Sequence, residues 1–86
     1  MVVATQIWPD GAMVRRVVDT ALFPDGRRWA DLAARAMAVA PPYRPVPGMT
    51  IYHISVDDHV ILVAEQDLAG PLLDLVTAVM ALGSEI

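Results

Sequence analysis

Five polar side chains lie close enough together in the sequence to raise the question of catalysis or metal binding. They are His53, Ser55, Asp57, Asp58 and His59. A zinc site needs three or four convergent ligands, usually histidine, cysteine or carboxylate. A serine nucleophile needs a base within hydrogen-bond reach. The chain has no cysteine and no further histidine, so a metal site would have to use both imidazoles.

The spacing of this group predicts a β-hairpin instead of a reaction centre. Two adjacent aspartates between apolar runs favour a turn, because their side chains bond the local backbone. With Asp57 and Asp58 as the loop, the alternation of strand side chains sends His53 and His59 to opposite faces of the sheet. Ser55 then has no positioned base. We therefore expect a protein that is not an enzyme and that carries no catalytic residue, no metal and no cofactor.

Composition favours one small domain over residues 1–86. The chain is 56% hydrophobic and 19% charged, far from the composition of a disordered protein. A net charge of −4 without a basic stripe argues against nucleic acid as a partner. The absence of cysteine favours the cytoplasm. No signal peptide is expected, and the most apolar stretch, residues 68–82, is too short and too interrupted to span a membrane.

The first apolar runs predict a hairpin over residues 2–8 and 13–19. The Asp10-Gly11 pair between them is typical of a two-residue type I′ turn, which would place Trp8 opposite Met13. On that register the expected core face comprises Val3, Ile7, Val14 and Val18. The opposite, wetter face would carry Gln6, Arg15 and Asp19.

A helix is expected over residues 27–39, with Asp25 as its N-cap. Its apolar side chains recur at helical spacing. They are Trp29, Leu32, Ala33, Ala36 and Met37. Four prolines exclude helix from residues 40–48, which should form a stiff, extended connection.

The second half repeats this plan. A hairpin is expected over residues 49–56 and 59–65, followed by a helix that begins near Gly70-Pro71 and ends at Gly83, beside a tail expected to fray at Ser84. The expected apolar face of this helix comprises Leu68, Leu72, Leu75, Val76, Val79 and Met80.

The resulting order ββαββα predicts an α+β fold, a four-stranded antiparallel sheet with two helices on one face. A strand order 2-1-3-4 makes every neighbouring pair antiparallel. The Asp10-Gly11 turn, the proline-rich connection and residues 65–70 then share one end of the sheet. Met1, the Asp57-Asp58 turn and residues 20–25 share the other. Both faces of the second hairpin are apolar, so the face without helices is expected to bind a partner or a second copy in a homodimer.

Two segments are candidates for binding a protein partner. The first is the hairpin tip, which comprises Trp8, Pro9, Asp10 and Gly11. The second comprises Tyr43 and Arg44, set among prolines. Exposed tryptophans are frequent at binding hot spots, and a proline-restricted segment loses little entropy on binding. The alternatives are that Trp8 folds back on the sheet edge and that Tyr43 and Arg44 belong to a spacer.

Several stretches of the chain resemble the emfourin family. They are residues 17–20 (Val-Val-Asp-Thr), the short helix with Leu32, residues 52–56 (Tyr-His-Ile-Ser-Val) before an acidic turn, and above all residues 65–76 (Glu-Gln-Asp-Leu-Ala-Gly-Pro-Leu-Leu-Asp-Leu-Val). Emfourins are small bacterial proteins typified by an inhibitor of protealysin, a thermolysin-like zinc metalloprotease. The resemblance covers almost the whole chain. Family members often carry glycine and phenylalanine at the first hairpin tip, where this chain has Trp-Pro-Asp-Gly-Ala.

The resemblance implies a non-enzymatic inhibitor that occludes the active-site cleft of a thermolysin-like metalloprotease inside the cell. A different hairpin tip implies a different target or affinity if the tip contacts the protease. An immunity or antitoxin-like role, or another protein-interaction role without a protease target, is the alternative for a small domain with few flexible loops. A ligand-binding or catalytic domain has no residue set to support it.

Overall fold

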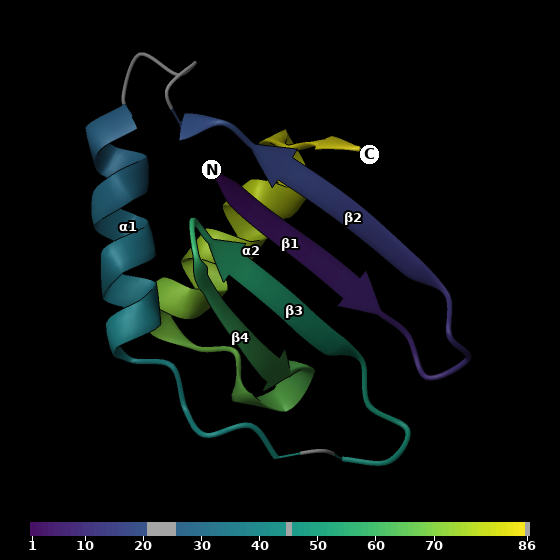
Figure 1. The fold of residues 1–86 in the computed structure, drawn as a ribbon. Coiled ribbons are helices and arrows are strands. Elements are labelled where there is room, and N and C mark those ends of the chain that lie inside the picture. The colour runs from purple at the N-terminus through teal and green to yellow at the C-terminus, as the bar shows by residue number, and fades with distance from the viewer. Residues whose placement is uncertain (21–25, 45, 86) are drawn as a thin grey trace.

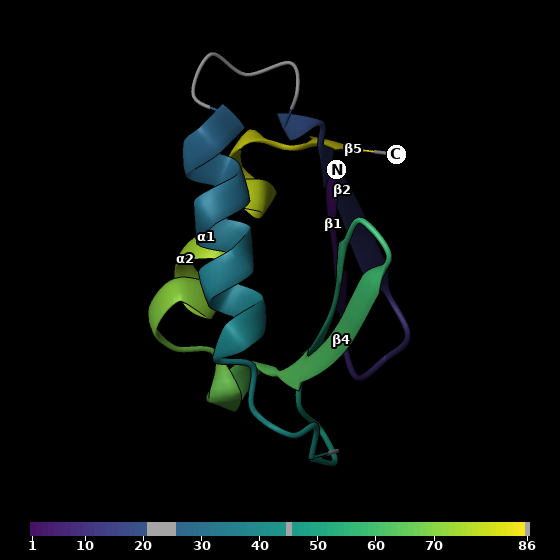
Figure 2. The same ribbon diagram turned by 60° about the vertical axis from the view of Figure 1, so that its left-hand side comes forward.

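The computed structural model describes residues 1–20, 26–44 and 46–85 and has an α+β architecture. The elements in chain order are β1 (Val2–Ile7), β2 (Met13–Val18), α1 (Gly26–Ala38), β3 (Ile51–Val56), β4 (His59–Ala64), the 3₁₀ helix η2 (Glu65–Asp67), α2 (Gly70–Leu82) and β5 (Ser84–Glu85). The strands form one antiparallel sheet in the order β4-β3-β1-β2-β5. Both helices lie on one face of it (Figures 1 and 2).

The expected ββαββα order and the strand order 2-1-3-4 are therefore confirmed. The structure adds β5, which pairs with β2 opposite Arg16 and Val17. The expectation that Ser84 lies in a fraying tail was wrong, because this residue extends the sheet. The proposed N-cap Asp25 lies outside the described residues.

The first hairpin differs from the expected register by one residue. Ile7 pairs with Met13, and the loop has three residues, closed by bonds from Trp8 N to Ala12 O (2.8 Å) and from Gly11 N to Trp8 O (2.9 Å). Gly11 has φ +91°, whereas Asp10 does not have the positive φ that a type I′ turn demands. Proline prefers the second position of a type I turn, so Pro9 starts the turn one residue earlier than Asp10 would.

This shift reverses the expected faces of β1. A register change of one residue exchanges the two sides of a strand. Val2 and Ala4 are buried in the core at 1% and 0% exposure, and the register carries Val3 and Ile7 to the opposite face. Gln6, expected on the wetter face, lies on the helix-covered side with Val14 and Val18.

The core lies between the sheet and the apolar stripes of the two helices. Its buried side chains come from β1, β2, β3, β4, α1 and α2. They are Val2, Ala4, Val18, Trp29, Ala33, Ala36, Tyr52, Ile54, Val63, Leu72, Leu75, Val76 and Val79. Leu32, Leu68 and Met80 pack against this set. Both helical stripes expected from the sequence therefore face the sheet.

The end of α2 lies very close to β2 at Gly83. A Cβ added there would stand 3.1 Å from both Arg16 Cβ and Val17 O and 2.5 Å from Val79 O. The Arg16 side chain donates a hydrogen bond from Nη1 to Gly83 O (3.4 Å). A cation at the C-terminus of a helix is favourable for the helix dipole. Glycine is required here by lack of space, since its φ of −70° is available to any residue.

Gln6 and Tyr52 form a partly buried polar pair near the end of the sheet that holds the first hairpin tip. Gln6 Nε2 donates a hydrogen bond to Tyr52 Oη (3.0 Å). Burial, followed by the nearby Glu65 carboxylate, raises the pKa of Tyr52 above its ordinary value of 10.0, and the Gln6 bond partly opposes the rise. The neutral phenol is thus the form that the folded state favours.

Tyr52→Phe is expected to flatten the alkaline loss of stability. A pKa raised on folding contributes stability that is complete below the unfolded pKa and is lost as the pH rises through the folded pKa. The free energy of unfolding of the natural protein should therefore fall more steeply above about pH 10 than that of the variant. At neutral pH the variant should be less stable by about 1 kcal/mol. Urea titrations between pH 8 and 11 measure the free energy of unfolding of both proteins. Parallel pH curves would contradict the raised pKa of Tyr52 in the folded state.

No helix in the described part of the chain is long and apolar enough to cross a bilayer.

Candidate functional site

The hairpin tip after β1 is a rigid, protruding turn. Besides the two backbone bonds that close it, Asp10 Oδ1 accepts a hydrogen bond from Ala12 N (2.9 Å). Pro9, Asp10 and Gly11 are exposed, whereas Trp8 is half-buried. The tip, residues Trp8–Ala12, therefore presents four exposed residues on a fixed backbone, because Ala12 is exposed as well, and Trp8 is partly accessible to a partner.

The connection between α1 and β3 presents the second candidate segment. Tyr43 is 38% exposed and Arg44 is exposed. No regular element is formed by residues 40–44, as the prolines predict. Nearer to β3 the chain turns, with Met49 N bonded to Val46 O (3.2 Å) and Gly48 at φ +78°. Pro45 lies outside the described residues.

Strand pairing brings the two segments to the same end of the molecule. Ile7, the last residue of β1, pairs with Ile51, the first residue of β3. The tip that follows Ile7 and the connection that precedes Ile51 therefore leave the sheet together, as expected from the sequence (Figure 1). Within the described ranges, no hydrogen bond joins the two segments. They share an end of the sheet, and each is held by its own local interactions.

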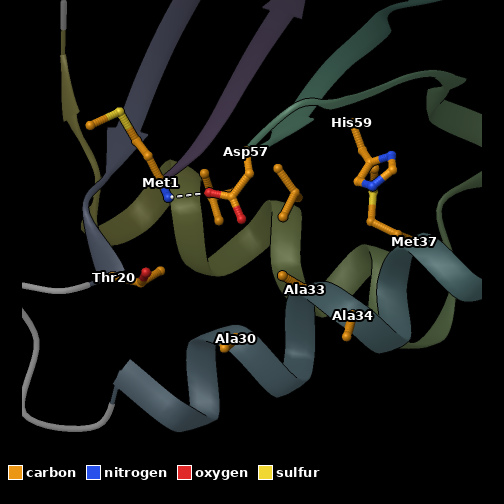
Figure 3. A pocket seen from close by; sticks show the side chains of 10 residues that line it. Met1, Thr20, Ala30, Ala33, Ala34, Met37, Asp57 and His59 are labelled. Carbon is orange, nitrogen blue, oxygen red and sulfur yellow. Dashed lines mark hydrogen bonds and ion pairs between the residues drawn. The ribbon is translucent and has the colours of Figure 1, made fainter.

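The opposite end of the sheet holds a pocket of about 390 Å³ between α1 and the strand ends (Figure 3). The terminal ammonium of Met1 pairs with Asp57 Oδ1 at 3.0 Å on its rim, and His59 also lines it. Thr20 lies here as well, so the expected meeting of Met1, Thr20 and the aspartate turn is confirmed. Residues 21–25, expected at the same end, lie outside the described part of the chain, and no ligand is assigned to the pocket.

The sequence interpretation missed this pocket. Its helical wall is made by small side chains, Ala30, Ala33 and Ala34, with Met37 one turn further. Alanines at helical spacing opposite a strand end leave space beside the sheet. This run in α1 is therefore the available signal, but only Ala33 and Met37 of these residues belong to the expected apolar stripe.

The polar group around the second hairpin is arranged as a turn. Asp57 has φ +51°, which aspartate tolerates better than most residues. Ser55 Oγ donates a hydrogen bond to the backbone oxygen of Asp57 (3.4 Å), so its hydroxyl group is engaged within the turn. The pairings His53↔Leu62 and Val56↔His59 send the two imidazoles to opposite faces, as predicted. Within the described ranges, no three histidine or carboxylate side chains gather as metal ligands.

The face of the sheet away from the helices also bears a hollow. This hollow of about 360 Å³ lies over β1, β2 and β3. Both helices lie on the other side of the sheet, so neither covers this face (Figure 2). The residues of the hollow include Val3, Ile7 and Met13, the last of which is 62% exposed. The register shift thus adds apolar side chains of the first hairpin to the open face, and the hollow is also lined by Thr5, Arg15, His53 and Ser55.

No protein-family model matches the chain, and no curated protein or solved structure is significantly similar to it.

Proposed function

We propose that this chain is a non-enzymatic inhibitor of a thermolysin-like zinc metalloprotease, which it blocks by non-covalent occlusion of the active-site cleft. The observation that carries the proposal is the common position of two exposed, conformationally restricted segments, the Trp8–Ala12 tip and the Tyr43-Arg44 segment, at one end of the sheet. The class of target rests on the resemblance to emfourins.

The physical properties of the two segments suit an inhibitor. A metalloprotease cleft takes an extended backbone by strand-like pairing and one side chain in a specificity pocket. An inhibitor must fill this cleft with backbone that does not relax into a cleavable geometry. Three hydrogen bonds fix the Trp8–Ala12 tip, and prolines restrict the other segment. Both segments would lose little conformational entropy on binding.

Trp8→Ala and Tyr43→Ala are each expected to weaken inhibition by about 1–3 kcal/mol, the usual cost of removing an aromatic anchor. Titration of the protein into a thermolysin-like protease with a fluorogenic peptide gives the inhibition constant. A thermal melt of each variant is needed beside it, because Trp8 is half-buried and could contribute to packing.

The matched control is Asp57→Asn with Asp58→Asn, at the opposite end of the sheet. Asparagine tolerates the positive φ at Asp57, so this variant should fold and should inhibit like the natural protein. If it loses inhibition while the two aromatic variants keep it, the binding end is the one with Met1 and Thr20. If the natural protein leaves the protease fully active and instead neutralises a toxin, the immunity role replaces the proposal.

A further inference from the structure

The open face of the sheet combines an apolar surface with a selective absence of carboxylates. The chain carries ten acidic residues, yet strand alternation places none of them on this face of β1, β2, β3 or β4. Only Arg15 and His53 can ionise there. Val60 and Leu62 of the edge strand β4 are 56% and 38% exposed. An acidic protein that keeps one apolar face free of negative charge can bring two copies of that face together without repulsion.

The exposed apolar side chains and the hollow occupy different parts of the face. Val60 and Leu62 are exposed on the edge strand β4, and the hollow of about 360 Å³ lies over β1, β2 and β3. A half-turn about an axis parallel to the strands, lying between two facing sheets, exchanges β4 with β2 and β3 with β1. Val60 and Leu62 of each copy then lie over β2 of the other, and the strands stay nearly aligned, as in common sheet-on-sheet packing.

The charges select this axis over the alternative. Across the middle of the face, the register aligns Leu62, His53, Thr5 and Arg15 in one row. An axis perpendicular to the strands would place Arg15 over Arg15 and His53 over His53. The parallel axis instead places Leu62 of each copy over Arg15 of the other, where the aliphatic part of the arginine can pack and its charge can reach solvent.

We propose that a second copy of this chain covers the open sheet face, in a two-fold dimer whose axis runs parallel to the strands. This inference is independent of the proposed inhibition. Four six-residue strands about 4.8 Å apart offer a patch on the order of 20 Å square. Two such patches, each about 400 Å², bury roughly 800 Å², below the range of standard-size specific interfaces. The dimer is therefore weak, with a dissociation constant on the order of 10–100 µM.

Sedimentation equilibrium of the natural protein and of charge variants at position 62 tests the proposal. Leu62→Arg faces Arg15 of the other copy and should weaken the dimer at least about tenfold, whereas Leu62→Glu faces the same arginine and should weaken it less. Adding Arg15→Glu to Leu62→Arg should restore association. Leu73→Arg is the matched control, since Leu73 is similarly exposed at 42% on α2, and it should leave the dimer unchanged.

Each contrary result is decisive. A natural protein that stays monomeric up to about 1 mM overturns the dimer. Equal weakening by Leu62→Arg and Leu62→Glu without rescue by Arg15→Glu overturns the axis. A monomer whose open face gains hydrogen-exchange protection only when a protease is added assigns the face to that partner instead. Circular dichroism checks folding, and Val60→Arg, at the more exposed of the two β4 positions, supplies a second variant expected to weaken association.

Discussion

Leu75→Ala is expected to lower the free energy of unfolding by about 3–4 kcal/mol. Leu75 is 0% exposed on the sheet-facing side of α2 and belongs to the core with Ile54 and Val63. Its truncation removes buried apolar contacts and leaves a cavity, because the surrounding core relaxes only partly. A domain of this length has a total stability of about 4–13 kcal/mol, so the variant would lose a large share of it. Urea unfolding followed by tryptophan fluorescence measures the change.

Leu73→Ala provides the matched control on the same helix. Leu73 is 42% exposed, so its truncation should change stability by about 0.5 kcal/mol or less. Similar losses for the two variants would contradict the observed rotation of α2 against the sheet.

Gly83→Ala is expected to destabilise the protein by about 2–3 kcal/mol, although alanine is the smallest possible replacement. The added methyl group would meet the backbone oxygens of Val79 and Val17 and the Cβ of Arg16. Relief of the contact with Val79 O requires the end of α2 to change, and relief of the contacts with Arg16 and Val17 requires Gly83 to move away from β2. That movement would also disturb the Arg16–Gly83 hydrogen bond and the pairing of β5. The change in urea midpoint, at constant slope, measures the loss.

Ser84→Ala tests whether space at Gly83 is responsible. Ser84 is the next residue and is exposed, so its variant should retain nearly full stability. A Gly83→Ala protein within about 0.5 kcal/mol of the natural one would show that the close approach of α2 and β2 is looser than the structure has it.

The sequence was sufficient for the element order, the strand order and both helical stripes, since these depend on periodicity and on the direction of each connection. Trp29, Leu72 and Leu75 lie where their spacing predicts. The register of the first hairpin could not be predicted from the sequence, because it depends on whether Pro9 or Asp10 begins the turn. A competition between two adjacent turn residues thus decided which side chains of β1 reach the core.

The candidate binding end was predictable in position but not in detail. Strand directions alone bring the Trp8–Ala12 tip and the Tyr43-Arg44 segment to one end. The half-burial of Trp8 depends on packing against its surroundings, which local sequence does not encode. The β5 strand was missed for a similar reason. Two residues have too little pattern to predict a strand, and Ser84 joins the sheet because Gly83 brings the chain beside β2.

The central position of β1 governs how the sheet can assemble. Each hairpin and its helix are local in sequence, but the two hairpins share the sheet where β1 meets β3, from Val2↔Val56 to Ile7↔Ile51, and the short strand β5 adds a second link to β2. Closing that seam joins residues far apart along the chain, and such non-local pairing slows folding. We therefore expect the transition state to be reached when two partly formed halves dock, with the proline-restricted connection setting how readily they meet.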